Sequence, residues 1–237
     1  MIKDSGCHWM GFGFESFSPI VLKSMRKPIT PEQIDKVIKT CLELKVPITG
    51  NFIFGDPAET METAKVTLDY WKKNCKGQVK LFFVHPYPGS EIFKYCVRNG
   101  LIKDKLDYIK NKIHHTNLIN MTKMSEKEYQ QLIKEIFNAK KNYERYSIPS
   151  KVKKSDSGRY EVHAKCPFCK KEMYYKNLSL PNKHYFMMNV LCRNENCHMR
   201  FFIMTGLYRF TRNYYLELDF LRKNYLSVRD SLRRKRL

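Results

Sequence analysis

The pattern of hydrophobic and polar residues predicts alternating strands and helices over the first 145 residues. Three apolar runs, at residues 8–14, 46–54 and 79–84, have the length and the aromatic and β-branched content of buried strands. Between the first two runs, apolar residues recur at helical spacing, at Ile34, Val37, Ile38, Cys41 and Leu42. The order strand, helix, strand, helix, strand predicts a parallel sheet with right-handed crossovers.

Two helix starts have local signals. Thr30 and Gln33 have the spacing of a capping box, and so have Ser125 and Glu128, which precede a long apolar stripe. The boxes predict a helix after Thr30 and a long helix after Ser125. Further helices are expected over residues 58–75 and 90–98.

The remaining third of the chain is built differently. Residues 148–158 combine a proline with several Ser and Lys residues and are predicted to be a linker. Short alternating stretches predict small antiparallel strands at 160–162, 173–175, 185–191 and 201–204. A final helix is expected over 211–232. The expected parts are therefore a first domain (1–147), the linker (148–158), a small β module (159–205), and a helix with a basic tail (206–237).

The charge of the chain is strongly positive and uneven. Its 237 residues include 44 Lys and Arg against 23 Asp and Glu, a formal charge of +21. Residues 1–150 hold 24 basic and 16 acidic side chains, and residues 151–237 hold 20 and 7. A polyanionic partner such as nucleic acid is one explanation. A compositional bias spread over a solvated surface is the other, and both remain open.

No segment is apolar for long enough to predict a membrane partner. The longest apolar runs, such as residues 81–84 and 201–204, are far shorter than the roughly 20 residues that span a bilayer. No basic stretch followed by an apolar one opens the sequence. We therefore expect a soluble, cytoplasmic protein.

Four of the eight cysteines have the spacing of a metal site. Cys166 and Cys169 form one close pair, and Cys192 and Cys197 form a second pair 22 residues later. Four thiolates suit tetrahedral zinc, and a closed site of this kind stabilises a fold instead of catalysing a reaction. The alternative is four unliganded thiols, and the neighbouring His163 or His198 could replace one ligand. The hypothesis is a structural zinc ribbon.

Polar residues and glycines follow each of the three predicted strands. Since α/β folds build their sites at the carboxyl ends of strands, these loops are candidates for a binding site. Glu15 and Ser16 could hydrogen-bond a sugar diol, and Gly55 would let the backbone approach a flat ring. For Glu15 and Glu59 the alternative is a helix N-terminal position, where the dipole stabilises a carboxylate.

The ordered set of motifs resembles the later half of radical S-adenosylmethionine (radical SAM) enzymes, especially those with a cobalamin-binding domain before the barrel. The motifs are Gly6-Cys7, Gly13-Phe-Glu15-Ser16, Leu22, Met25 and Lys27, Gly55-Asp-Pro-Ala-Glu59-Thr60, Pro86-Tyr-Pro-Gly-Ser90-Glu91, Gly100-Leu-Ile, Asn117-Leu and Met124-Ser125. The likeness covers residues 1 to about 145, and the cysteine-paired tail is similar to appendages of that subgroup.

The resemblance implies roles for the strand-end residues. Glu15 and Ser16 would meet the ribose of S-adenosylmethionine. The loop beside the adenine would comprise Asn51, Ile53, Gly55 and Glu59, and the bracketing strand end would comprise Val84, His85 and Pro86. Asn51 and Ala58 stand where the family usually has glycine, and these two departures are mild.

The family's iron-sulfur motif is absent from this sequence. Radical SAM enzymes hold a 4Fe-4S cluster with the triplet C-x3-C-x2-C, and no three of the cysteines here have that spacing. A complete β/α barrel takes about 200 residues or more, but only three strand-helix units are predicted. The expected fold is therefore a partial (half) parallel β/α barrel, followed by the zinc-ribbon-like β module and the C-terminal helix.

These observations together predict the C-terminal segment of a radical SAM enzyme, inactive alone. It would bind S-adenosylmethionine and a 4Fe-4S cluster only with the missing N-terminal half or with a cluster-bearing subunit. In the resembling subgroup the full enzyme would also use cobalamin, for methyl transfer.

Two hypotheses of another class remain. The basic module could bind nucleic acid, with aromatic residues at Tyr174, Tyr175, Tyr185, Phe186, Phe201 and Phe202 among Lys and Arg. The alternative role for these aromatic residues is a small core under the metal. The chain could also be a non-catalytic scaffold descended from the enzyme.

Overall fold

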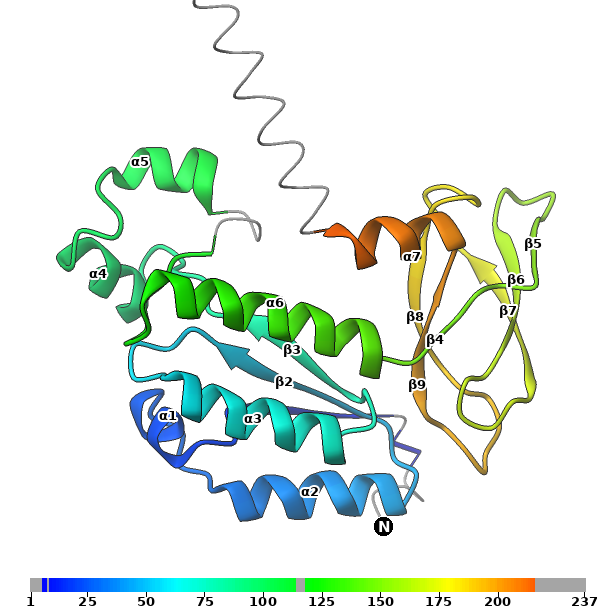
Figure 1. Ribbon diagram of the computed structural model, residues 1–237. Helices are drawn as coiled ribbons and strands as arrows, with labels where there is room; N and C mark the ends of the chain where they lie inside the picture. Colours follow the sequence, from blue (N-terminus) through cyan, green and yellow to red (C-terminus); the bar gives the residue numbers. More distant parts are fainter. Residues whose placement is uncertain (1–5, 8, 114–117, 216–237) are drawn as a thin grey trace, which may run out of the picture. The chain divides into compact units, whose positions relative to one another are not determined.

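The protein divides into two compact units, Met1–Tyr143 and Glu144–Leu237. The structure is a computed structural model that describes residues 6–7, 9–113 and 118–215 (Figure 1). Most of the helix predicted over 211–232 lies outside the described residues. Among those that are described, no helix combines the length and the apolar character that crossing a membrane requires.

A three-stranded parallel sheet forms the centre of the N-terminal unit. Its strands are β1 (Met10–Glu15), β2 (Ile48–Phe54) and β3 (Val79–Phe83), in the spatial order β1-β2-β3. Both neighbouring pairs are parallel. The predicted α/β class with a parallel sheet is therefore confirmed, with strand ends that differ from the expected ones by one or two residues.

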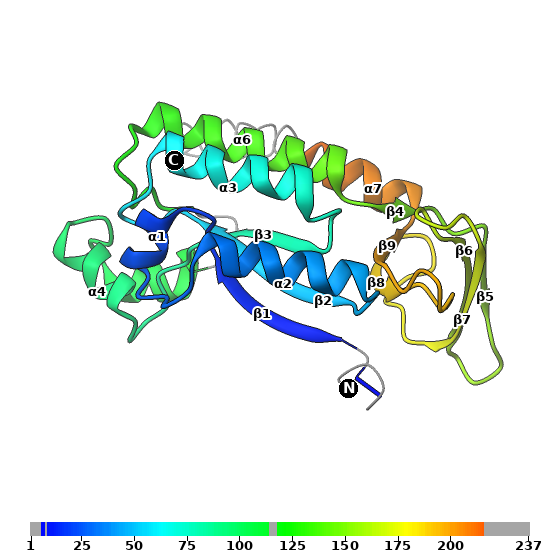
Figure 2. The ribbon, with the colours of Figure 1, turned by 90° about the horizontal axis from the view of Figure 1, so that it is seen from below.

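Helices cover one face of this sheet. Three of them, α2 (Pro31–Glu43), α3 (Met61–Asn74) and α6 (Glu126–Tyr143), lie on the same side of the strands (Figures 1 and 2). Shorter helical segments complete the unit: α1 (Pro19–Ser24), α4 (Glu91–Arg98), α5 (Lys105–Asp107) and the π-helical η1 (Tyr108–Lys112). α4 and the stretch that leads from it to α6 share a small core of their own, made by Phe93, Cys96, Ile102, Tyr108 and Met121.

The two faces of the sheet differ in exposure. On the helix side, β2 buries Ile48, Phe52 and Phe54 completely or almost so. On the opposite side the alternate residues are only half-buried, and Phe82 of β3 is 44% exposed. One face of the sheet therefore carries the core of this unit, and the other face is open.

Hydrogen bonds at the helix starts confirm both predicted capping boxes. The Gln33 amide donates to Thr30 Oγ1, and the Thr30 amide donates to Gln33 Oε1 at 3.0 Å. Ser125 and Glu128 exchange the equivalent bonds. A third box was not predicted. It pairs Thr60 with a threonine three residues later, so that α3 begins at Met61 and not at residue 58.

Substituting alanine for Thr60 is expected to lower the free energy of unfolding of the N-terminal unit by about 1 kcal/mol, because one cap of α3 loses its acceptor. Thr63 N–H donates to Thr60 Oγ1 at 3.3 Å, and alanine removes that acceptor. The measurement is urea unfolding followed by tryptophan fluorescence, since Trp9 and Trp71 both lie in this unit.

Thr40→Ala, at an exposed position on α2, is the matched control and should change stability by less than about 0.5 kcal/mol. Equal losses in the two variants would mean that the box contributes nothing.

Small strands in two sheets form most of the regular secondary structure in the described part of the C-terminal unit. One sheet has the order β5-β6-β7 and is antiparallel, and the other has the order β4-β9-β8. The strands are β4 (Tyr146–Ser147), β5 (Lys151–Lys154), β6 (Tyr160–Lys165), β7 (Glu172–Leu178), β8 (Met187–Leu191) and β9 (Arg200–Met204). The four predicted strands are all present, and β8 pairs antiparallel with β9.

The predicted linker is the main correction to the expected organisation. Residues 151–154 lie within the expected linker 148–158, but they form β5 and pair with β6. The division between the two units falls after Tyr143 instead. Beyond the strands, α7 (Gly206–Asn213) begins five residues before the expected helix, because Thr205 accepts a hydrogen bond from the Tyr208 amide as its N-cap.

Candidate functional site

The carboxyl ends of β1, β2 and β3 bring the predicted strand-end residues to one edge of the sheet. Glu15 ends β1 and lies opposite Phe52 of β2. Gly55 follows β2, and the Val84 amide, just after β3, donates to the Phe54 carbonyl at 2.8 Å. A Cβ added at Gly55 would lie 3.8 Å from the Val84 nitrogen, so these two loops touch.

At the end of β1, Glu15 forms an ion pair that its sequence motif did not predict. Its Oε1 lies 2.9 Å from Lys27 Nζ. A Cβ at Gly13 would come within 2.7 Å of that oxygen and 3.0 Å of that nitrogen, so the absence of a side chain at Gly13 makes room for the pair. Lys27 was part of the recognised motif without a role, and the structure adds it to the strand-end residues.

Ser16 is enclosed within the protein. Its side chain is 1% exposed, and its hydroxyl lies 3.1 Å from Thr67 Oγ1 of α3 and accepts from the Ser18 amide at 3.1 Å. These bonds fasten the loop after β1 to α3. The geometry therefore favours a structural role for Ser16 over the predicted contact with a ribose.

Glu59 supports the turn after β2 from inside. It is 1% exposed, and its Oε2 accepts a 2.6 Å hydrogen bond from the amide of Gly55, whose φ is +104°. Thr60, not Glu59, is the N-cap of α3. The Glu59 carboxyl therefore caps the Gly55 turn. It is not the cap of a helix N-terminus, and it is not exposed to a ligand.

Burial makes Glu59 an unusual acid. Desolvation raises its pKa to about 8; the bond from Gly55 opposes the rise and the charge of Asp56 adds to it. Its Oε1 and the Tyr129 hydroxyl of α6 are buried without hydrogen-bond partners among the described residues. Burial, and secondarily the Glu59 charge, also raises the pKa of Tyr129. At neutral pH Glu59 is therefore mostly protonated.

The other predicted residues lie on the open face or at the loops. Asn51 pairs with Gly13, and Ile53 pairs with the exposed Phe82, so both belong to the face that the helices leave open. Val84 and His85 are half-buried, and Pro86 is buried. Apart from Ser16 and Glu59, which are enclosed, the predicted cofactor residues lie along one edge and one face of the sheet.

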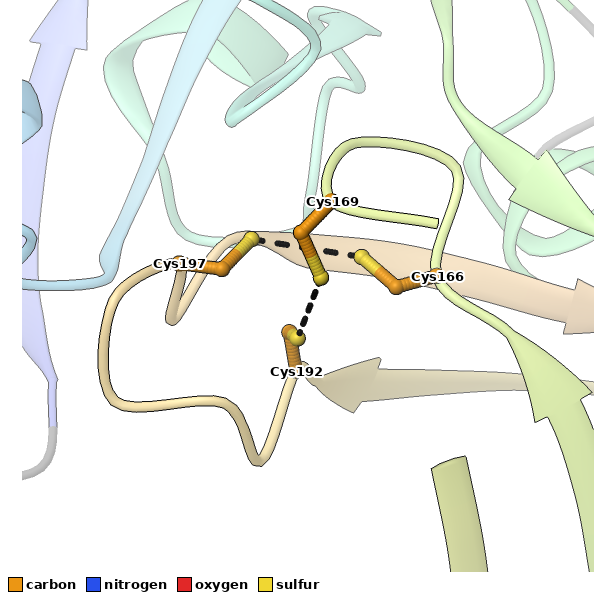
Figure 3. Close-up of side chains that lie close together, drawn as sticks. All are labelled: Cys166, Cys169, Cys192 and Cys197. Atoms are coloured by element: carbon orange, nitrogen blue, oxygen red, sulfur yellow. Dashed lines mark hydrogen bonds between the residues drawn. The ribbon is translucent and has the colours of Figure 1, made fainter. Parts of the chain in front are cut away.

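The four paired cysteines converge in the C-terminal unit. All four Sγ atoms lie within 4.8 Å of one another (Figure 3). Cys166 and Cys197 are 3.9 Å apart, and Cys169 and Cys192 are 3.6 Å apart. A tetrahedron with metal–sulfur bonds of about 2.3 Å has edges of roughly 3.8 Å. The observed separations therefore match a site for one tetrahedral ion.

Two similar turns hold these thiols. After β6, the Lys170 amide donates to the Cys166 carbonyl at 2.9 Å, and Lys170 has a φ of +64°. After β8, the amides of Cys197 and His198 both donate to the Asn194 carbonyl, and His198 has a φ of +48°. The second turn accommodates the four residues that separate Cys192 from Cys197. Because all four cysteine sulfurs converge, neither His163 nor His198 is needed as a substitute ligand.

The thiols differ in how readily they ionise. Burial opposes ionisation of Cys169, but hydrogen bonds from the Lys171 amide, from Asn194 and from neighbouring thiols lower its pKa to about 6. Burial raises the pKa of Cys192 and Cys197. Cys169 therefore ionises more readily than Cys192 and Cys197, and an arriving cation would favour the thiolate form of the ligands that it binds.

The spacing of the sulfurs also excludes a larger cluster. A 4Fe-4S cluster places several iron and sulfide ions between its cysteine ligands and therefore holds them farther apart than a single ion does. Four sulfurs within 4.8 Å fit a single metal ion only. This set is chemically distinct from the cluster site of a radical SAM enzyme.

Comparisons with known proteins relate the chain to one superfamily and to methyltransferases. The radical SAM superfamily model matches residues 1–70. An uncharacterized methyltransferase of Pyrococcus horikoshii is 36% identical over 101 residues, which are 43% of this chain and 22% of that protein. The bacteriochlorophyllide d C-8(2)- and C-12(1)-methyltransferases of Chlorobaculum tepidum are 29% and 33% identical, over 43% and 38% of this chain and 23% and 20% of theirs.

The matched stretch therefore spans about a fifth of the length of these curated relatives. Among solved structures, the match to the Elp3 protein of Methanocaldococcus infernus covers 78% of this chain and 55% of that chain, at 12% identity and a TM-score of 0.37. The superfamily match and the methyltransferase relatives agree with the strand-end motifs, and the resemblance to the radical SAM family that the sequence predicted is confirmed.

Proposed function

We propose that residues 1–147 form a partial parallel β/α barrel that supplies one wall of the S-adenosylmethionine pocket of a radical SAM enzyme. The observation that carries the proposal is the convergence of Glu15, Gly55 and Val84 on the carboxyl edge of one parallel sheet. Binding sites of parallel α/β sheets and barrels form at this edge.

The residues at this edge suit the two halves of the nucleoside. Glu15 and Lys27 offer an acceptor and donors, in partly exposed positions, to ribose hydroxyls and other polar groups of the cofactor. Ile53 offers an apolar contact to the adenine, and Asn51 lies beside it on the open face. Glu59 holds the Gly55 turn in its left-handed conformation, and therefore acts through the backbone. His85 and Pro86 would extend the wall after β3.

The open face of the sheet favours a partner that covers this face and carries the 4Fe-4S cluster. In a closed barrel this face would be covered by side chains of the other strands. Here Gly11 and Gly13 are exposed and Phe82 is 44% exposed. Since the sequence lacks C-x3-C-x2-C, we propose that an N-terminal half or a separate subunit completes the barrel and brings the 4Fe-4S cluster.

The reaction that we propose for the completed enzyme is methyl transfer. The curated relatives are methyltransferases by name, two of them acting on a bacteriochlorophyllide. When bound, S-adenosylmethionine and the cluster would supply radical chemistry, and cobalamin would be a methyl carrier in the full enzyme. The residues of this chain would hold and orient the nucleoside, and we expect no catalysis from the chain alone.

For the C-terminal unit we propose a zinc-ribbon-like module over residues 159–205 whose ion is structural zinc. Four thiolates leave no open coordination position for a substrate or water. The turns after β6 and β8 would each supply two ligands.

Millimolar S-adenosylmethionine is expected to shift the amide resonances of Gly13, Gly55 and Val84 in the purified chain, because half of the pocket retains weak affinity for the nucleoside. The measurement is a titration followed by 1H-15N NMR, with S-adenosylhomocysteine in parallel. Gly55→Val should abolish the shifts, because valine is strained at a φ of +104°.

Lys39→Ala on the exposed side of α2 should leave the shifts intact. The proposal fails if the perturbed amides lie away from the strand ends. It also fails if the chain, supplied with iron, sulfide and a reductant, cleaves S-adenosylmethionine on its own.

A further inference from the structure

We propose that the outer face of the β5-β6-β7 sheet binds single-stranded nucleic acid, through stacking on Tyr174 and His163 and through lysine contacts with the phosphates. The proposal concerns the C-terminal unit alone and does not depend on the function proposed for the N-terminal unit. It specifies which residues of the basic module would make the contact.

The strand register separates an inner from an outer face. Val162 pairs with Tyr175, and Ala164 pairs with Met173; all four are buried in the core of the module. Because side chains alternate along a strand, the residues between them point to the opposite face. That face carries Lys151 and Lys153 of β5, Glu161, His163 and Lys165 of β6, and Glu172, Tyr174 and Lys176 of β7.

An aromatic pair lies in the middle of this face. The rings of His163 and Tyr174 are neighbours across β6 and β7, with centroids 4.5 Å apart and an interplanar angle of 36°. Lys176 Nζ lies 5.0 Å from the Tyr174 centroid. Both rings are half-buried, so they are held in place and still accessible. Such a platform can stack on any unpaired base, with Lys176 free to turn to a phosphate.

Lysines surround the aromatic pair. Lys151, Lys153, Lys165 and Lys176 are all exposed, and they come from all three strands. The face also holds the acidic residues Glu161 and Glu172, so four lysines stand against two carboxylates on it. Over residues 144–215 the unit has fourteen Lys and Arg against five Asp and Glu. The charge of the face and of the unit complements a polyanion.

Burial decides which of the aromatic residues named from the sequence could stack on a base. Tyr175, Phe186 and Phe201 are 6%, 1% and 1% exposed and belong to the core beside the cysteines, as the alternative reading held. They are unavailable for stacking. Tyr185 and Phe202 are accessible, but they lie before β8 and in β9, outside the β5-β6-β7 sheet. On the outer face of that sheet Tyr174 is joined by His163, which the sequence suggested only as a metal ligand.

A single strand suits this face better than a duplex does. Stacking needs bases whose faces are free, and these are paired and stacked inside a duplex. The three-stranded sheet is also wider than the helix or two-stranded ribbon that the major groove of a duplex admits. Purely ionic binding would leave the aromatic pair without a role, and the experiment distinguishes that case.

The test uses fluorescence anisotropy of the full chain with a labelled oligouridine of about 20 nucleotides. We expect Tyr174→Ala to raise Kd about 5- to 150-fold, and Tyr174→Phe, which keeps the ring, to bind nearly as the unchanged chain does. A Lys151→Ala/Lys153→Ala double variant should reduce the slope of log K against log salt by about 1.4, since two phosphate contacts are lost.

Lys36→Ala/Lys39→Ala on α2 removes the same charge from the other unit and should change nothing. Metal content and far-UV circular dichroism of each variant establish that the module is folded. The proposal is wrong if an abasic oligonucleotide or a duplex of equal length binds as tightly as oligouridine. It is also wrong if Tyr174→Ala is without effect, or if binding is undetectable at about 50 mM salt.

Discussion

Cys166→Ser is expected to remove the metal ion from the C-terminal unit and to unfold that unit. Cys166 is fully buried, and its sulfur is one of four within 4.8 Å. Binding of structural zinc contributes an apparent 10–16 kcal/mol or so in small modules, more than a core of this size supplies alone. The purified chain should contain about one zinc ion, and the variant close to none.

Elemental analysis measures the metal, and the 1H-15N NMR spectrum of residues 144–215 reports the folding of the unit. The two tryptophans lie in the other unit, so their fluorescence should stay unchanged and serves as an internal reference. Cys7→Ser is the matched control, because Cys7 lies outside the cysteine cluster. Iron in place of zinc would contradict the proposed ion, and an intact, metal-free unit would contradict its structural role.

Glu59→Gln is expected to abolish a pH dependence in the stability of the N-terminal unit. The carboxyl's pKa is near 4.5 when it is solvated and about 8 in the fold. Between these values the folded state holds a proton that the unfolded state has lost. The free energy of unfolding should therefore fall as pH rises, by up to about 1.4 kcal/mol per pH unit, and level off above the folded pKa. Glutamine has no such proton, so this slope disappears.

The slope is measured by urea unfolding at a series of pH values, again through tryptophan fluorescence. Trp71 is a suitable reporter because it is 1% exposed and its indole donates to the Val79 carbonyl. Above pH 8 the glutamine variant should be the more stable protein, since an ionised Glu59 would be buried beside Asp56. Glu43→Gln, at an exposed position on α2, should keep the original slope. If the free energy of unfolding of Glu59→Gln still fell with pH at the original slope, a group other than Glu59 would be responsible for the pH dependence.

Local signals in the sequence predicted much of the secondary structure. Capping boxes at Thr30 and Ser125 involve residues three positions apart, so the sequence contains the whole interaction. The box at Thr60 was missed because threonine replaces the usual Glu or Gln at its last position. The short helix α1 was missed because six residues are too few to show a period.

Non-local pairing explains the wrong linker prediction. Residues 151–154 are three lysines and a valine beside serines and a proline, a composition typical of linkers. They become β5 because β6 offers them a partner strand across an antiparallel turn. Composition describes the chain alone, whereas a strand at the edge of a sheet depends on its neighbour.

The sequence alone determined the parallel order of the first three strands and the identity of the four converging cysteines, because both follow from period and spacing along the chain. Only the tertiary structure decided which side chains are enclosed. Ser16 and Glu59 stand in motifs that point to a cofactor, but they form hydrogen bonds within the protein. Tyr174 and Tyr175 are neighbours in the chain with opposite surroundings. The physical reason is that burial depends on contacts between distant segments, which no local pattern records.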